Sequence, residues 1–402
     1  MDNRYSKSAD ARSVGAVCIF ILGGILIAGL WPFHPPRNEV NRLKNEYGLH
    51  FGRYGDAVSA GAFQVKVAKD RTSCSLEIWL APSDPDQANT ILAFDSSPDP
   101  TEPFSLEQDR RDLVIKRLVL DRQGRTKKLT LKVRGIFRDR SPVFVTITAG
   151  GQNTAVYRDG TSVTVSRGFG MSGKDISGRL VVAGSTVNDS WSGQMLGLAI
   201  YRKQLTPGQV SEHYGTWTRN LRPFIASDEV PTALYDFNER NGDVVRNQVD
   251  PTTDLTIPAR YLVLHPQLLQ PAWRDYRFGL PGWSYWKDVA INIAGFVPLG
   301  FCFLSYFSSV RHIKRAAGTV IVLGFLLSLA IETSQRLLPT RDSDMTDVIT
   351  NTLGTVLGVL ACRWTLAHKL FTGARDRAVS VLENLSRIFC QISADFARYC
   401  KH

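Results

Sequence analysis

The chain has 402 residues, of which 44% are hydrophobic and 21% charged, and its formal net charge is +11. That length allows two or three domains. A surplus of basic residues would suit a nucleic-acid-binding protein, but many of them flank apolar runs, as in the segment 311–315, or follow Arg363. This distribution is typical of membrane proteins, so we expect no nucleic-acid partner.

The first predicted element is an apolar helix over residues 14–31, which is long enough to cross a bilayer. A cleaved signal peptide is the alternative. No A-x-A cleavage site follows the run, however, and Trp31-Pro32-Phe33 fits an aromatic anchor at the membrane interface. We therefore predict an uncleaved signal anchor, with the basic residues 1–13 in the cytoplasm.

Residues 45–220 are predicted to form an all-β domain. Short alternating or β-branched runs, such as 75–80, are separated by Gly, Asp, Asn and Pro, a pattern that favours a β-sandwich. One amphipathic helix is expected at 206–217, and residues 221–285 are predicted to be a β-rich extension and linker. Cys74 is the one cysteine of the domain and is expected to be a small buried side chain.

Short segments of this domain follow one another as a first strand, a core strand with an aromatic residue, a hairpin and a closing strand that leads into a helix. They are Gly48-Leu49-His50-Phe51, Ser75-Leu76-Glu77-Ile78-Trp79-Leu80, Val156-Tyr157-Arg158-Asp159-Gly160, Trp191-Ser192-Gly193-Gln194 and Leu205-Thr206-Pro207. Together they resemble the laminin G-like, concanavalin A-like jelly-roll superfamily. The resemblance implies glycan or protein binding, sometimes with calcium. The carboxylate pair of the glucanase branch is not evident, and Trp79 and Trp191 are expected to pack in the core.

Three further transmembrane helices are predicted within residues 286–366, at about 289–310, 316–334 and 346–364. The basic connection 311–315 is expected in the cytoplasm. An even number of spans then returns the C-terminus to the cytoplasm, where 370–402 is predicted to be an amphipathic tail on the inner surface. The prediction is a multi-pass protein of the bacterial cytoplasmic membrane, with a four-helix transmembrane bundle and an extracytoplasmic concanavalin A-like sandwich.

Polar residues interrupt these apolar helices. An ionisable group at the bilayer centre costs roughly 2.5 to 3.5 kcal/mol, so such groups usually face the bundle interior and mark function. Each helix carries one polar stripe, and Arg341 in the short outer loop is expected to add a positive charge suited to phosphate or carboxylate. We expect these residues to converge on one outward-opening pocket: Asp288, Asn292, Ser328, Glu332, Gln335, Arg341, Asp347 and Asn351.

The spacing of these residues is specific. It consists of Asp288-x3-Asn292-x2-Gly295-Phe296-x-Pro298-x-Gly300, then Ser328-x3-Glu332-x2-Gln335, then Arg341, Asp344 and Asp347-x3-Asn351-x2-Gly354-x3-Gly358. It resembles the VanZ-like family. The resemblance implies a protein of the bacterial cell envelope and, for the family's namesake, a link to glycopeptide resistance. Trp31-Pro32-Phe33 resembles the end of that family's first helix, so the β-domain is expected as an insertion after it.

The sequence leaves three functions open. In the first, the chain binds or processes the head group of a lipid-linked saccharide or phosphate at the outer leaflet, with the intramembrane residues as its site. In the second, the outer domain binds an envelope glycan, and the helices are a non-catalytic anchor whose polar residues join neighbouring helices. The third, a small-solute transporter, is disfavoured because four helices without discontinuous pairs are few for transport. Membrane lipid is an expected partner in each case.

Overall fold

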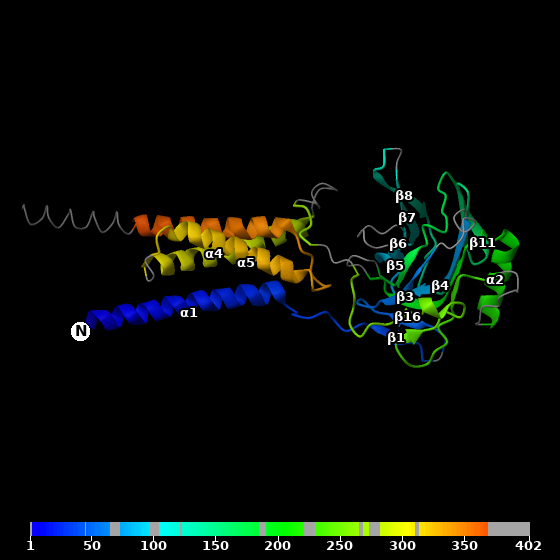
Figure 1. The fold of residues 1–402 in the computed structure, drawn as a ribbon, viewed down its shortest axis with the longest axis horizontal. Coiled ribbons are helices and arrows are strands. Elements are labelled where there is room, and N and C mark those ends of the chain that lie inside the picture. The colour runs from blue at the N-terminus through cyan, green and yellow to red at the C-terminus, as the bar shows by residue number, and fades with distance from the viewer. Residues whose placement is uncertain are drawn as a thin grey trace, which may run out of the picture. The chain divides into compact units, whose positions relative to one another are not determined.

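The computed structural model forms two compact units (Figure 1). A helical unit contains Met1–Pro32, Leu268–Gln335 and Ser343–His402, and a β unit contains Phe33–Gln267 and Arg336–Asp342. The residues that the structure describes are 2–44, 46–64, 73–95, 104–120, 123–184, 190–220, 230–264, 268–272, 282–309 and 313–368. The predicted tail 370–402 therefore lies outside the described residues.

The helical unit contains four helices that are long and apolar enough to cross a membrane. They are α1 (Asp2–Leu30), α4 (Trp283–Ser309), α5 (Ala316–Gln335) and an unlabelled final helix, Met345–His368, which Figure 1 draws in orange. The prediction of four transmembrane-type helices is confirmed. Because each helix contains a predominantly apolar stretch of at least 18 residues, the number of these helices can be predicted from the sequence.

Glycines bring α4 and the final helix into backbone contact. A Cβ atom built on Gly358 would lie 2.1 Å from the carbonyl oxygen of Val297, and one on Gly354 would lie 2.2 Å from that of Ile293. On α4, a Cβ atom at Gly300 would lie 2.1 Å from the carbonyl oxygen of Thr355. Only glycine allows this approach, which is common where membrane helices cross closely. Gly295, which belongs to the same sequence motif, has no such contact: a Cβ atom there would meet nothing within 4 Å.

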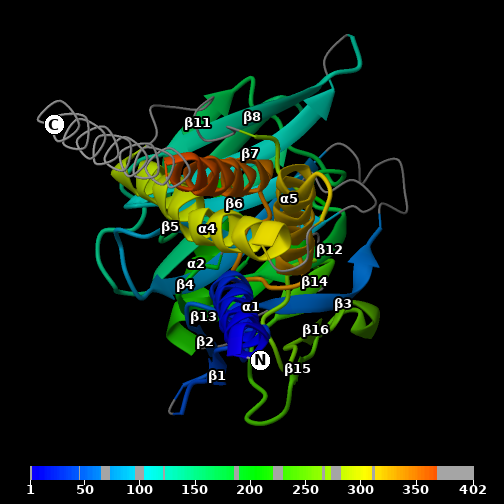
Figure 2. The same cartoon turned by 90° about the vertical axis from the view of Figure 1, so that its left-hand side faces the viewer.

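The β unit is a sandwich of two antiparallel sheets (Figure 2). The first runs in the order β1 (Val40–Arg42), β2 (Leu49–Phe51), β13 (Gly193–Tyr201), β4 (Ser73–Pro82), β9 (Val143–Gly150), β10 (Asn153–Arg158) and β11 (Thr161–Arg167), with β14 (Ala233–Tyr235) also on β13. The second runs in the order β15 (Val244–Val245), β16 (Leu255–Thr256), β3 (Ala57–Phe63), β12 (Gly178–Val182), β5 (Ala88–Asp95), β6 (Phe104–Asp109), β7 (Asp112–Leu120) and β8 (Thr126–Val133). The predicted all-β sandwich is confirmed. Because β14 and β16 pair with strands of the two sheets, the predicted extension 221–285 contributes strands to the sandwich.

Strand β4 shows how the sequence builds the two faces of the first sheet. Its alternate residues Leu76, Ile78 and Leu80 enter the core between the sheets, as the period of two requires. The residues between them, including Glu77, lie under helix α2 (Pro207–Asn220), which covers the outer face. Both faces are therefore buried, which explains why β4 has so few exposed side chains.

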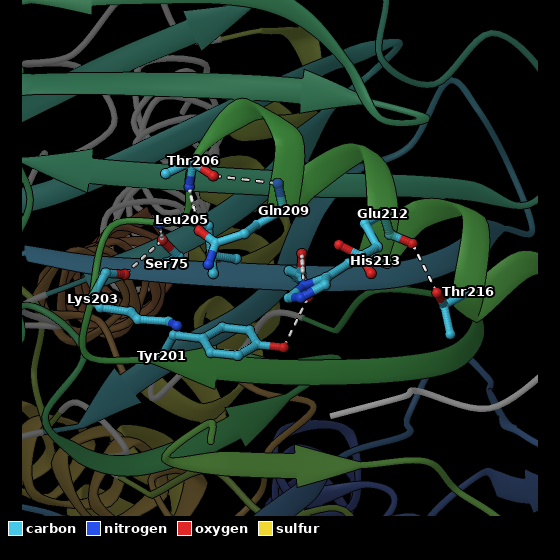
Figure 3. Close-up of polar contacts among 10 residues, drawn as sticks. Ser75, Tyr201, Lys203, Leu205, Thr206, Gln209, Glu212, His213 and Thr216 are labelled. Atoms are coloured by element: carbon cyan, nitrogen blue, oxygen red, sulfur yellow. Dashed lines mark hydrogen bonds and ion pairs between the residues drawn. The ribbon is translucent and has the colours of Figure 1, made fainter. Parts of the chain in front are cut away.

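Helix α2 begins with a reciprocal cap. The backbone N–H of Thr206 donates to the Gln209 side chain at 2.8 Å, and the backbone N–H of Gln209 donates to the Thr206 hydroxyl at 3.3 Å (Figure 3). This is the capping-box arrangement, in which two N–H groups of the first turn find partners. Trp217 then packs against the sheet at Gly197, where a Cβ atom would lie 2.1 Å from the indole ring.

Two core expectations are confirmed by burial. Cys74 is 1% exposed, and Trp191 is fully buried between the sheets, where its indole N–H donates to Gln108 Oε1 at 2.7 Å. Trp79 is partly buried against the cluster under α2. These aromatic side chains therefore stabilise the sandwich and are not exposed platforms for a sugar ring.

Candidate intramembrane site

Helix α5 turns one narrow stripe of polar and small residues toward the interior of the helical unit. Ser328 is fully buried, Glu332 is 2% exposed and Gln335 is 7% exposed. Four residues separate the first two, and three more lead to Gln335, so all lie on one helix face. The stripe continues through Gly324 and Val320, which are also buried. The polar residues therefore face the other helices, as the sequence predicts.

Ser328 connects α5 directly to the final helix. The amide Nδ2 of Asn351 donates to the Ser328 hydroxyl oxygen at 2.9 Å, and Asn351 is 5% exposed. One turn further on, the Thr355 hydroxyl donates to the Asn351 carbonyl oxygen at 3.1 Å. A Cβ atom on Gly324 would lie 2.4 Å from that hydroxyl, so the two helices touch along this line.

Glu332 reaches the start of the final helix. Its Oε2 accepts the backbone N–H of Asp344 at 2.9 Å, and the Asp344 carboxylate in turn accepts the backbone N–H of Thr346 at 2.7 Å. The second contact is an N-cap, and a carboxylate near a helix N-terminus is favoured by the helix dipole. One role of Glu332 is therefore to fix the turn from which the final helix begins.

Gln335 reaches α1. Its Nε2 donates to the carbonyl oxygen of Gly29 at 2.8 Å, which places α1 beside the C-terminal end of α5. The other amide atom, Oε1, is buried without a hydrogen-bond partner, and so is Oδ1 of Asn351. Buried polar atoms normally have partners, so two such acceptors in one cluster indicate a place where a donor can bind.

Four of the eight predicted site residues make up this buried cluster: Ser328, Glu332, Gln335 and Asn351. Asp288 is exposed on α4 because the glycine contacts turn Ile293 and Val297 toward the final helix, and Asp288 lies about 140° around the helix from Ile293. Asn292 is half-buried.

The last two predicted residues lie outside the cluster. Asp347 is half-buried, in the first turn of the final helix. Arg341 is exposed and belongs to the segment Arg336–Asp342, which groups with the β unit; its backbone N–H donates to the Leu338 carbonyl oxygen at 2.9 Å.

The final helix also contributes threonines that the sequence pattern had not marked as part of the site. Thr346, Thr350 and Thr355 are all buried, and the Thr350 hydroxyl donates to the Thr346 carbonyl oxygen at 3.0 Å. The sequence does contain an indication that Thr355 is buried, because Thr355 lies four residues after Asn351 and therefore on the same face of the helix. Within the part of the chain that the structure describes, no three His, Cys, Asp or Glu side chains are arranged to hold a metal ion.

The β unit contains a second buried polar cluster, which the sequence did not indicate. Glu77 on β4 is fully buried and contacts His213 Nδ1 of α2 at 3.0 Å, and the Tyr201 hydroxyl on β13 donates to Glu77 at 3.2 Å (Figure 3). The Tyr201 and His213 rings stack with their centroids 5.8 Å apart. All three side chains are buried and contact one another across three elements, so the cluster fixes α2 on the sheet.

Each of the two parts of the chain matches a known family model. Residues 197–367 match the VanZ/LLP1 family model, and residues 53–211 match the model of the concanavalin A-like lectin/glucanases superfamily. The VanZ/LLP1 match begins inside β13, well before the segment 288–358 that carries the resemblance. A search of curated proteins finds no match.

Similar solved structures include a protein described as carbohydrate-binding from Bacteroides ovatus, at 14% identity and a TM-score of 0.35, covering 56% of this chain and 62% of that one. The CBM40 of the Ruminococcus gnavus IT-sialidase has 13% identity and a TM-score of 0.32, covering 42% of this chain and 96% of that one. Botulinum neurotoxin type C has 13% identity and a TM-score of 0.30, and the match spans 45% of each chain. We draw no functional conclusion from similarities at this level. The family matches and the four apolar helices show a membrane protein that joins a concanavalin A-like β-domain to a VanZ-like segment.

Proposed function

We propose that the chain is a cell-envelope protein that binds or processes the head group of a lipid-linked glycan or phosphate at the outer leaflet. The observation that carries the proposal is the buried cluster of Ser328, Glu332, Gln335 and Asn351, in which two amide oxygens have no hydrogen-bond partner. A polar cluster of this kind is costly between apolar helices, and it is usually retained for a ligand or a reaction.

The chemistry of the cluster favours a ligand rich in hydroxyl groups. The Glu332 carboxylate and the free oxygens of Gln335 and Asn351 are acceptors, and sugar hydroxyls are donors. In this proposal Glu332 acts as a general base or positions the hydroxyl that reacts. The concanavalin A-like domain binds a glycan.

The proposal requires the β-domain and the outer helix ends to lie outside the cytoplasm. The basic residues of 1–13 and of 311–315 support that orientation, because cytoplasmic segments are enriched in Lys and Arg. A reporter that is active only outside the cytoplasm should work when fused within the turn that precedes Thr161 and fail when fused after Arg315. The reverse pattern would overturn the proposed orientation.

One specific observation favours a second function, a glycan-binding anchor with a purely structural bundle. Glu332 accepts the backbone N–H of Asp344, and Asn351 donates to Ser328, so part of the cluster joins elements of the bundle. If that is its whole role, the ligand binds only to the β-domain.

Replacement of Glu332 by Gln distinguishes the two functions. A glutamine retains an oxygen that can accept the Asp344 N–H, so the turn and the abundance of the protein should stay near normal while the negative charge is lost. Binding of a polyprenyl-phosphate-linked sugar, followed by native mass spectrometry, should fall at least tenfold if the carboxylate binds the head group. The matched control is Ser334→Ala, on the same helix but exposed. Unchanged binding by Glu332→Gln would contradict the proposed site.

A further inference from the structure

A short segment of the helical unit pairs with the turn that leads into the final helix. The segment is 268–270, which we call the latch, and the turn is 343–345; both belong to the same unit. The backbone N–H of Gln270 donates to the Ser343 carbonyl oxygen at 2.8 Å, and the Met345 N–H donates to the Gln270 carbonyl oxygen at 3.1 Å. These two hydrogen bonds form a parallel β-bridge, so the latch holds the start of the final helix along one side.

Glu332 holds the same turn along the other side. Asp344 lies between the two residues that bond to the latch, and in a parallel bridge such a residue directs its own backbone N–H away from the partner segment. That N–H donates to Glu332 Oε2 at 2.9 Å. While the turn stays in this place, one oxygen of the Glu332 carboxylate is therefore occupied by the protein itself.

Two features of the latch indicate that it opens readily. Leu269 has a φ of 49°, a left-handed conformation that residues other than glycine rarely adopt and that is common in ligand clamps and switch regions. Burial also contributes little, because Leu268 is 45% exposed and the next two residues are only half-buried. The third bond of the latch runs from the Leu269 N–H to the hydroxyl oxygen of the buried Ser343, at 3.1 Å. A segment held mainly by hydrogen bonds opens at low free-energy cost.

We propose that the latch regulates the intramembrane site by controlling access to Glu332. When closed, it keeps the turn 343–345 on the carboxylate; when open, it lets the turn move away, so that both carboxylate oxygens can contact a ligand. This regulation rests on the proposed function of the cluster. Because a ligand that needs the open state binds only the fraction of molecules in that state, weakening the latch should increase both the reactivity of Glu332 and the apparent affinity for the ligand.

The first test needs no ligand. The full chain in phosphatidylcholine nanodiscs is treated with N,N′-dicyclohexylcarbodiimide, a hydrophobic reagent that modifies carboxyl groups, and the modification of Glu332 is followed by mass spectrometry. Ser343→Ala removes the acceptor of the Leu269 N–H, and Gln270→Pro removes the N–H that bonds to the Ser343 carbonyl oxygen. Glu332 should be modified about fivefold faster in Ser343→Ala, as the loss of one hydrogen bond predicts, and faster still in Gln270→Pro.

The matched control is Ser334→Ala, an exposed position on α5 whose hydroxyl donates to the Ala330 carbonyl oxygen of the same helix. Its Glu332 should be modified at the wild-type rate. Circular dichroism checks that each variant retains its helices. Wild-type rates of modification in both folded latch variants would overturn the proposal, and so would an equal increase in the control.

The second test adds a polyprenyl-phosphate-linked sugar to the wild-type chain and follows hydrogen exchange of the latch amides. Exchange at Leu269, Gln270 and Met345 should become faster when the probe binds, and Ser343→Ala should bind the probe about fivefold more tightly than wild type. Bound probe with unchanged exchange would contradict the proposal. Faster modification of Glu332 in the latch variants without any binding of the probe would support the latch and refute the proposed ligand, so the two failures are distinguishable.

Discussion

Gly358→Ala should destabilise the helical unit, whereas Gly295→Ala should not. A Cβ atom at position 358 would lie 2.1 Å from the Val297 carbonyl oxygen and 2.8 Å from the Phe301 nitrogen, both backbone atoms that cannot rotate away. The helices would have to separate until these distances exceed 3 Å, and forced overpacking typically costs about 1 to 3 kcal/mol. At Gly295 the added methyl group meets nothing within 4 Å, and helix propensity favours Ala by up to about 1 kcal/mol.

The two variants have the same chemical change and both positions are in transmembrane-type helices, so the contact is the variable that differs. Unfolding in mixed micelles, followed by circular dichroism as the fraction of dodecyl sulfate rises, measures the free-energy difference. The midpoint should fall for Gly358→Ala and stay equal or rise for Gly295→Ala. Equal midpoints, or a larger loss at position 295, would refute the close crossing of α4 with the final helix.

Two further predictions concern the β-domain. Burial raises the pKa of Asp56 to about 7, although hydrogen bonds from Leu262 and Asn38 act to lower it. Between about pH 4 and pH 7 the folded state therefore keeps a proton on Asp56 that the unfolded state releases. The contribution of Asp56 to stability should therefore fall by about 3 kcal/mol as the pH rises from 4 to 7, and Asp56→Asn should remove that contribution from the slope in thermal unfolding measured across this range. Tyr201→Phe removes one weak hydrogen bond to Glu77 and should cost about 0.5 to 1.5 kcal/mol, whereas Glu77→Ala, which also removes the acceptor of His213, should cost at least twice as much in denaturant unfolding.

The sequence predicts the helices and the polar stripe of α5 because both depend on local pattern. A long apolar run predicts a membrane helix by length alone, and Ser328, Glu332 and Gln335 share a face at any rotation of α5. Which face turns inward depends on the neighbouring helices. For α4 that rotation is set by contacts of Gly354 and Gly358, which lie more than fifty residues away in the sequence. The spacing of Asp288 and Asn292 could not reveal it.

The cluster under α2 shows a similar limit for the β-domain. Glu77 lies between two apolar residues of β4, and strict alternation predicts that it faces solvent. It is buried because α2 covers that face and brings His213 to it from 136 residues further along the chain. Alternation therefore predicts the side of a sheet on which a residue lies, but not whether another element covers that side.

The hydrogen bond of Glu332 explains why an oxygen atom is needed at this position, but it does not explain why that oxygen belongs to a carboxylate. A glutamine at this position could accept the Asp344 N–H as well, so the hydrogen bond alone requires an oxygen and not a carboxylate. The charge at 2% exposure adds a desolvation cost, part of which the N-terminal dipole of the final helix offsets. Gln335 and Asn351 each have a buried amide oxygen without a hydrogen-bond partner, and an acceptor of this kind cannot stabilise a negative charge. In the proposed function this carboxylate serves proton transfer or a donor-rich ligand. The glutamine variant, which removes the charge and keeps the oxygen, therefore distinguishes the proposed site from a structural joint.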